Sequence, residues 1–352
     1  MIRRVVGGHD RATMLVNLYC THRSPPAITF PHRLNARRDR SDSELGAHLN
    51  GFMGFVMDRG RRPMTATRYA VLQHLGRVQH HVSLHVDEAH EEALTAWATA
   101  ANALLFFEDA TVRDPNGLVI VDPGSGDPEP GARVPSPTDA RARKDATTRS
   151  LAARSIRIVS SLPPSISEVE VFMRSPAEVT SRCFALFACA VRAESIANGD
   201  PIPSREILER LPHAVAAMSP SERRFFDAEA PEQRDVVDHV WRYESLAALA
   251  WSLSILADLP FPSAICDVGG LAQRILGLDP ASAARLTLRP APAILDALDL
   301  TFRVHWAVTD ARVNGGPVPR DVDASVVLER RRALNWLTRT EDVDWDELRM
   351  AT

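Results

Sequence analysis

Lysine is nearly absent from this chain of 352 residues, in which Lys144 is the one lysine and arginine supplies the other basic side chains. Genome base composition is the simplest explanation for this bias. Its chemical consequence is the same whatever the cause, because an enzyme that forms a Schiff base or uses lysine as a general base would have only Lys144 for that role. We therefore set those enzyme classes aside.

Cysteine is also scarce, and its four positions show no paired spacing: Cys20, Cys183, Cys189 and Cys266. A small secreted protein would use regularly spaced cysteines as disulfides. The first residues carry no apolar run of signal-peptide type, and no stretch approaches the roughly 20 apolar residues that span a bilayer. These absences predict a cytoplasmic protein with no membrane association.

A basic surplus is missing as well. The formal net charge is −4, and charged residues make up 24% of the chain. Proteins that bind nucleic acid generally carry a basic surplus, although a local basic patch around Arg37, Arg38 and Arg40 is compatible with this total. We expect no nucleic-acid partner.

The familiar catalytic and metal-binding motifs are not found. The chain has no Gly-Lys-Ser/Thr phosphate loop, no GxGxxG after a strand, no GxSxG and no CxxC. The stretch 90–94 begins like a zinc-protease HExxH but has Leu94 in place of the second histidine. The acidic stretch 341–347 lacks the glycine of a calcium loop. We predict no metal and no cofactor.

Histidine offers one further metal candidate. His74, His81 and His85 would share a face if a single helix ran through them. The alternation of HHVSLHVD instead predicts a half-buried strand that turns His81, Ser83, His85 and Asp87 outward. We favour the solvated strand over a metal site.

The first 122 residues are typical of a small α+β module. They predict strands at 14–20, 81–87 and 103–107, a hairpin at 111–122, a loop at 23–40, and helices at 44–60, 66–78 and after Asp87. Ser41 and Glu44 have the spacing of a capping box. The order of elements favours an α/β sandwich-like arrangement, with the helices on one face of a small sheet.

Residues 123–137 are dense in proline and glycine, and we interpret them as a linker. From 138 to 352 the signals are mainly helical, so the fold class is α+β with a larger helical domain after the linker. Capping boxes that start at Ser175 and Ser219 mark two helix beginnings. Longer helices are predicted at 233–256, 291–313 and 323–339.

Several segments after residue 150 resemble a bacterial family catalogued as domain of unknown function 4272. The segments are LPP (Leu162–Pro164), RSPAEVTSR (Arg174–Arg182), SPSERRFF (Ser219–Phe226), WRYESLAALAWSL (Trp241–Leu253), LPFP (Leu259–Pro262), ILDALDLTFRVHWAVTDAR (Ile294–Arg312), ERRRALNWL (Glu329–Leu337) and WDE (Trp345–Glu347). The resemblance covers about residues 150–352. It implies no activity, cofactor or catalytic residue.

Charged side chains interrupt the apolar stripes of the three long helices, and five of the six tryptophans lie after residue 240. A charge enters a core only when it is paired, so we expect these charges to meet inside the helical domain. Three interpretations are compatible with the pattern. The charges form an internal salt-bridge lattice, or they line a cleft for a small polar or anionic ligand, or they lie on ordinary solvated faces whose helical phase is assigned wrongly. The candidate binding residues are Arg242, Glu244, Asp299, Arg303, His305, Asp310, Arg330 and Asn335.

Two functions follow from these observations. The first is a non-catalytic binding or interaction protein that takes a protein partner or a small polar ligand and encloses a polar network. The alternative is an enzyme of the hydrolase or transferase type, with Glu244, Asp299 or His305 in a cleft for a small anionic or polar substrate, edged by Arg242 and Arg303.

The linker interpretation leads to a direct test. Cutting the chain between Gly126 and Pro135 should leave a folded C-terminal fragment, because few contacts are expected to cross a linker. Circular dichroism of the isolated fragment would measure its helix content. An unfolded fragment would mean that the boundary is misplaced.

Overall fold

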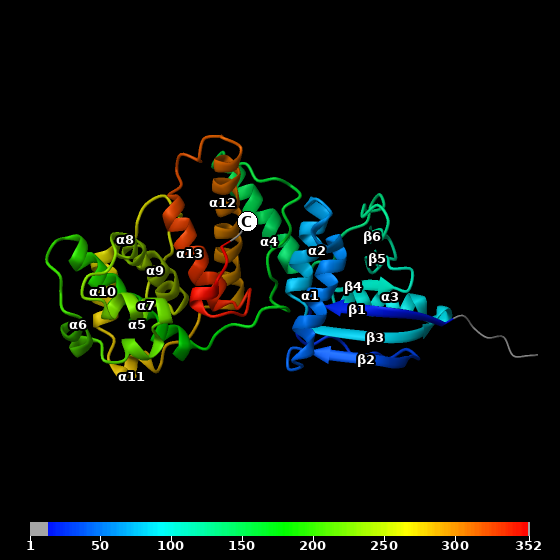
Figure 1. Cartoon of the computed structure of the whole chain (residues 1–352), viewed down its shortest axis with the longest axis horizontal. Helices are drawn as coiled ribbons and strands as arrows, with labels where there is room; N and C mark the ends of the chain where they lie inside the picture. Colours follow the sequence, from blue (N-terminus) through cyan, green and yellow to red (C-terminus); the bar gives the residue numbers. More distant parts are fainter. Residues whose placement is uncertain (1–12, 351–352) are drawn as a thin grey trace, which may run out of the picture. The chain divides into compact units, whose positions relative to one another are not determined.

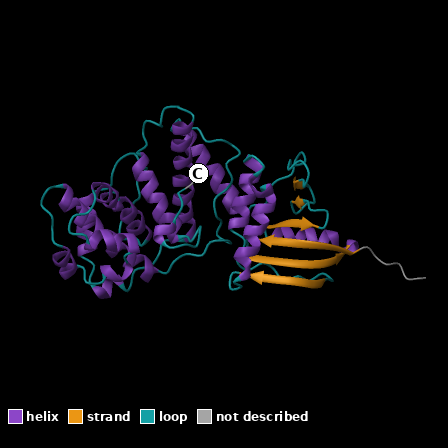
Figure 2. Cartoon of the chain, viewed as in Figure 1, coloured by secondary structure: helices purple, strands orange, loops and turns teal. Residues whose placement is uncertain are grey.

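The computed structural model describes residues 13–350, and the chain divides into two compact units (Figures 1 and 2). One unit comprises Met1–Arg141 and Ser160–Pro163, and the other comprises Ala142–Val159 and Pro164–Thr352. The first holds a sheet with helices and the second is mainly helical. The predicted α+β class, with a larger helical part after a mixed module, is confirmed.

Six antiparallel strands form the sheet of the first unit, in the order β2-β3-β1-β4-β5-β6. The strands are β1 Thr13–Cys20, β2 Arg33–Asp39, β3 His80–Asp87, β4 Ala103–Phe107, β5 Val112–Arg113 and β6 Val119–Val121. The helices of this unit are α1 Glu44–Val56, η1 Asp58–Gly60, α2 Ala66–Gly76, η2 Glu88–His90 and α3 Glu91–Ala100.

Helices cover both faces of this sheet, because successive side chains of a strand point in opposite directions. Leu18 of β1 packs in one core with Leu94 of α3. The next residue, Tyr19, packs in a second core with Phe52 of α1 and Leu75 of α2. The prediction that the helices lie on one face is therefore wrong.

The covered faces also explain why β3 departs from the expected solvated strand. His81 and Ser83 are buried, with 1% and 2% of their surface exposed. The His81 ring lies 4.1 Å from the His48 ring of α1, measured between centroids. Arg38 Nη1 lies 3.4 Å from His81 Nδ1, and His81 Nε2 lies 3.0 Å from Asn17 Oδ1. Because a guanidinium only donates, Nδ1 accepts and Nε2 donates.

The strand β2 lies in the stretch that was predicted as a loop. It pairs with β3 alone and forms one edge of the sheet. An edge strand has one side open to solvent and tolerates charged residues there. Arg33 and Arg37 are exposed. The arginine content of this segment is thus compatible with an edge strand.

The two capping boxes that start at Ser175 and Ser219 are confirmed, with both hydrogen bonds of each box present. The box predicted at Ser41 is absent. There the helix begins after Ser43, whose side chain makes no capping bond, and Asp42 Oδ1 accepts from the backbone N–H two residues later. Sequence spacing alone does not fix which residue caps the helix.

The second unit is built from helices around one main apolar core. Its helices are α5 Pro176–Ala197, α6 Ser204–Arg210, η3 Ala214–Ala217, α7 Pro220–Asp227, α8 Gln233–Val240, α9 Arg242–Ser252, α10 Val268–Leu276, α11 Pro280–Ala283, α12 Ala291–Val313, α13 Ala324–Leu337 and η4 Trp345–Glu347. The helix α4 Thr138–Ala153 begins in the first unit and continues into the second. Within residues 13–350, no helix has the length and hydropathy needed to cross a membrane.

The helix predicted at 233–256 is divided at Trp241 into α8 and α9. The N–H of Glu244 donates to the Trp241 carbonyl, three residues back, which tightens the chain at this point. Val237 is consequently 46% exposed and does not continue the buried stripe of α9. The single-helix prediction failed because hydrophobic spacing does not reveal a local interruption of the helix.

Residues 123–137 lie in the first unit, where Ala132 and Val134 pack against the core beneath α1 and α2. The independent folding of the two parts stays a prediction.

The last described segment, η4, folds back onto the helical unit. Trp345 is 3% exposed and lies under the Arg182 guanidinium, 4.1 Å from the ring centroid. The Asp346 carboxylate accepts hydrogen bonds from the Ser219 hydroxyl at 2.6 Å and from the Ser221 N–H at 2.9 Å. It therefore lies at the N-terminus of α7, where a negative charge is stabilised.

These contacts predict a pH-dependent contribution from Asp346. Burial raises the pKa of its carboxyl, but the hydrogen bonds from Ser219 and Ser221 outweigh burial and leave the pKa lowered. A depressed folded pKa stabilises the protein above the unfolded pKa, and this contribution is lost as the pH falls through the folded value. Asp346→Asn should cost about 1 kcal/mol at neutral pH, with the difference vanishing in strong acid. Urea unfolding over a pH series measures this.

The control for that series is Asp200→Asn, because Asp200 is exposed. Its effect should stay near zero throughout. A deficit for Asp346→Asn that does not change with pH would contradict the proposed role of the carboxylate charge.

Candidate functional site

Glu244 of α9 and Arg330 of α13 form an ion pair inside the helical unit, with Arg330 Nε 3.0 Å from Glu244 Oε2. Both side chains were expected to point inward, and each residue is 2% exposed. A buried charge without a partner costs several kcal/mol, so each of the two stabilises the other in the interior. The pair joins residues that are 86 positions apart in the sequence.

The same pair holds the coil between α9 and α10, residues 253–267. Glu244 Oε1 accepts a hydrogen bond from the N–H of Cys266 at 2.5 Å. Arg330 Nη1 donates to the carbonyl of Pro260, also at 2.5 Å. The coil is therefore attached at two points to the ion pair. Neither member of the pair can leave the interior without leaving the charge of the other buried and unpaired.

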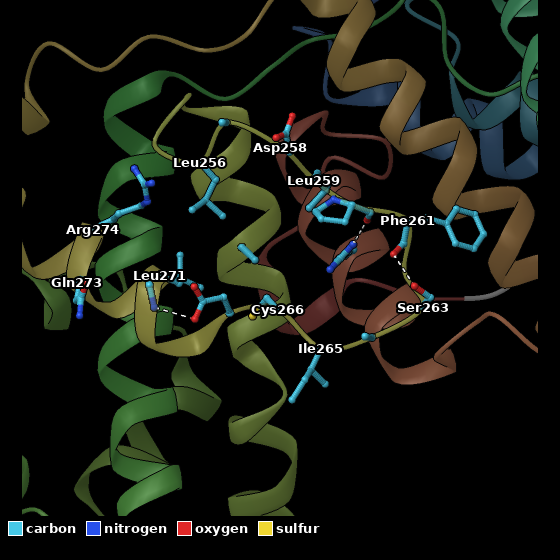
Figure 3. A pocket seen from close by; sticks show the side chains of 17 residues that line it. Leu256, Asp258, Leu259, Phe261, Ser263, Ile265, Cys266, Leu271, Gln273 and Arg274 are labelled. Carbon is cyan, nitrogen blue, oxygen red and sulfur yellow. Dashed lines mark hydrogen bonds between the residues drawn. The ribbon is translucent and has the colours of Figure 1, made fainter.

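A pocket of about 710 Å³ lies between this coil and α10 (Figure 3). Its volume is in the range that small-molecule sites occupy. The coil contributes Leu256, Leu259, Phe261 and Ile265, and α10 contributes Leu271 among others. These side chains make the wall largely apolar.

Four charged side chains also line the pocket: Asp258 and Asp267 from the coil, Arg274 from α10 and Arg330 from α13. The two signs are equal in number, so the lining carries no net formal charge. Asp258, Asp267 and Arg274 are exposed at the rim, whereas Arg330 is buried. The one charged group held away from bulk water is thus a hydrogen-bond donor.

Asp267 has a second task, because its Oδ1 accepts from the N–H of Gly270 at 3.0 Å and so caps α10. A Cβ at Gly270 would collide with the Asp267 carboxylate. Gly270 therefore leaves room for the Asp267 carboxylate to cap α10.

Cys266 is the one thiol in the pocket wall. Burial, together with the nearby Glu244 carboxylate, raises the pKa of the Cys266 thiol to about 12. Its Sγ lies 3.7 Å from the Tyr243 carbonyl, to which it donates. The thiolate is the nucleophilic form of cysteine, and the wall of this pocket disfavours it.

Arginine side chains donate hydrogen bonds to several carbonyl oxygens of the coil. Arg289 donates from Nε to the Trp251 carbonyl at 2.6 Å, and from Nη2 to the carbonyls of Leu256 and Ala257 at 2.8 Å. Arg274 donates to the Ile255 carbonyl at 3.3 Å. These bonds fix the coil in one conformation although it has no regular secondary structure.

A second interhelical pair, between Arg242 and Glu329, lies outside the pocket lining. Arg242 Nη1 lies 2.7 Å from Glu329 Oε1, and the Ser245 hydroxyl donates to Glu329 Oε2 at 2.7 Å. Burial alone would lower the pKa of Arg242, but the Glu329 carboxylate outweighs burial and raises it. This pair ties α9 to α13 a second time.

The third pair, Asp299 with Arg303, is closed from solvent. Both side chains are 0% exposed, and two hydrogen bonds of 2.8 Å join them within α12. The nearby Lys144 of α4 has its pKa lowered, first by burial and then by Arg303. The pair is part of the core and does not line the pocket.

His305 contacts Arg331, a residue that the sequence analysis did not single out. Burial and the Arg331 guanidinium lower the pKa of His305 to about 4. Since a guanidinium only donates, His305 Nδ1 accepts and the imidazole is neutral at physiological pH. This histidine is 9% exposed and is not among the pocket residues.

Two of the candidate residues stand apart from the others. Asp310 was expected to point inward but is exposed, and its Oδ1 accepts from Asn314 Nδ2 at 2.8 Å. The inward prediction is wrong because the helix α12 leaves the core near its C-terminal end. Asn335 is buried on α13, at 4% exposure, and does not line the pocket.

Most of the pocket was not found from the sequence. Of the eight candidate residues, Arg330 lines it and Glu244 lies directly behind Arg330. The missed residues belong to the coil and to α10, where the signals were the LPFP segment and the glycines before residue 271. Nowhere in the described part of the chain do three or more His, Cys, Asp or Glu side chains gather as a metal site would need.

Comparison with known proteins places this helical unit in a family. The family model described as Domain of unknown function (DUF4272) matches residues 143–348, so the chain belongs to that family. The resemblance inferred from the sequence is confirmed over nearly the same residues. No curated protein and no solved structure matches the chain.

The ion pair behind the pocket predicts a large stability effect. Glu244→Ala should destabilise the helical unit by about 3–5 kcal/mol, because it leaves Arg330 buried without its carboxylate. Thermal and urea unfolding would measure the loss. The control Asp310→Ala removes an exposed carboxylate and should change stability by roughly 0.5 kcal/mol or less. Equal effects of the two substitutions would rule out the structural role given to Glu244.

Proposed function

We propose that the DUF4272 domain of this chain is a non-catalytic binding module, which takes a small and largely apolar molecule into the pocket beside α10. The observation that carries this proposal is the pocket of about 710 Å³ with Arg330 buried in its lining. Binding sites of this kind combine apolar walls with a few fixed polar groups. Arg330 is such a group, because Glu244 and the Pro260 carbonyl hold it in place.

The chemistry of the lining favours binding over catalysis. Acid–base catalysis needs a titratable group that faces the substrate and can exchange a proton near neutral pH. Arg274 and Arg330 are hydrogen-bond donors, and the raised pKa of Cys266 keeps its thiol protonated. The rim carboxylates Asp258 and Asp267 are exposed.

The hydrolase or transferase alternative has less support. It relies on Glu244, Asp299 or His305 in an open cleft, and none of these lines the pocket. A protein partner fits less well than a small molecule as the occupant, because the volume of the pocket is in the range of small-molecule sites.

A panel of small molecules, read by thermal shift and ligand-observed NMR, tests the proposal. Binders should raise the midpoint of unfolding by roughly 5–10 °C at about 100 times Kd. The variant Ala264→Trp places a large ring at an exposed position of the pocket lining and should abolish the shift. The control Ala281→Trp, exposed on α11, should keep it.

The same NMR spectra separate binding from catalysis. A ligand that is recovered unchanged after long incubation supports the binding module. Conversion of a bound molecule into product would favour the enzyme. Binders whose shifts survive in Ala264→Trp would mean that another site is responsible and that the assignment of the pocket is wrong.

A further inference from the structure

The ion pair behind the pocket is balanced in charge but not in hydrogen bonds. Both oxygens of Glu244 are used, one by Cys266 and one by Arg330. Arg330 uses Nε on Glu244 and Nη1 on Pro260. Its Nη2 donates a hydrogen bond to no residue that the structure describes. This nitrogen is also not fully buried, because it is absent from the fully buried side-chain atoms that have no partner. The pocket therefore contains a donor that a ligand can use.

The charge balance determines which acceptor suits that donor. The carboxylate of Glu244 already neutralises the Arg330 guanidinium, and the rim holds two carboxylates against one arginine. An anionic ligand would add an uncompensated negative charge beside a buried neutral pair, which is unfavourable away from water. A neutral oxygen acceptor satisfies Nη2 without that cost.

The coil also supplies hydrogen-bond donors. The carbonyl oxygens of Leu256, Ala257 and Pro260 already accept hydrogen bonds from arginine side chains. The backbone N–H groups of Leu259 and Ile265, both in the pocket wall, have no acceptor within residues 13–350. These two N–H groups are further donors in the pocket wall that an acceptor on the ligand can satisfy.

We infer that the pocket selects a neutral ligand with an apolar body and a carbonyl oxygen, as in an amide, and that this oxygen accepts a hydrogen bond from Arg330 Nη2. The inference rests on the proposed function and deepens it, because it names the chemical class of the ligand. The apolar body lies against Leu256, Phe261 and Leu271.

A series of probes with one octyl-length chain and different head groups tests the inference. The probes are octanamide, octanoate and octylamine, whose heads are neutral, anionic and cationic at neutral pH. Octanamide should bind roughly tenfold more tightly than either charged probe, as expected for one hydrogen bond from a charged donor without added net charge. Ligand-observed NMR titration of the full chain gives the three values of Kd.

Arg330→Lys identifies the donor. Lysine keeps a positive charge for Glu244 but replaces the planar fork with a single ammonium, so the free Nη2 is lost. The variant should reduce the preference for octanamide to roughly twofold or less. The control Arg205→Lys makes the same exchange at an exposed position of α6 outside the pocket lining and should keep the preference.

The possible results distinguish the two proposals. Octanoate binding most tightly, or all three probes binding equally in the wild-type chain, would overturn the neutral-carbonyl inference and leave the binding module standing. Failure of every probe to bind, or binding that persists in Ala264→Trp, would overturn the pocket and the inference together. Because the wild-type head-group series decides by itself, a poorly folded Arg330→Lys protein does not remove the test.

Discussion

A carboxylate and a guanidinium in the interior of the helical unit determine the shape of its pocket. Glu244 and Arg330 need each other because neither charge can be buried alone. Their remaining atoms reach the Cys266 N–H and the Pro260 carbonyl. The irregular coil therefore takes its position from a contact between two helices. The pocket thus lies beside a charge pair whose remaining polar atoms bind the coil that lines it.

The parts that could be predicted from the sequence are those with local signals. The capping boxes at Ser175 and Ser219 fix helix starts through contacts three residues apart, and the helix at 291–313 shows its period along its whole length. The inward charges followed from a physical rule, since Glu244 and Arg330 interrupt apolar stripes. That rule identified one pocket residue and its partner without any knowledge of the pocket.

The remainder depends on contacts that no local pattern encodes. Arg330 and Pro260 are 70 positions apart, and nothing in LPFP indicates that its carbonyl receives a guanidinium. Trp241 continues the hydrophobic spacing although the helix is interrupted there. The buried His81 is polar and alternates like a solvated residue, so only the helix above it reveals its burial. In each case the tertiary environment overrides the pattern.

The strand order of the N-terminal sheet has a consequence for synthesis of the chain. β1 lies between β3 and β4, so Leu18 has its cross-strand neighbours at Val82 and Leu105. On the ribosome, β1 emerges long before either neighbour, with its backbone groups and apolar side chains open to other molecules. β1 gains both of its neighbours only after residue 107 has left the exit tunnel, and until then its unpaired edges favour association with other chains.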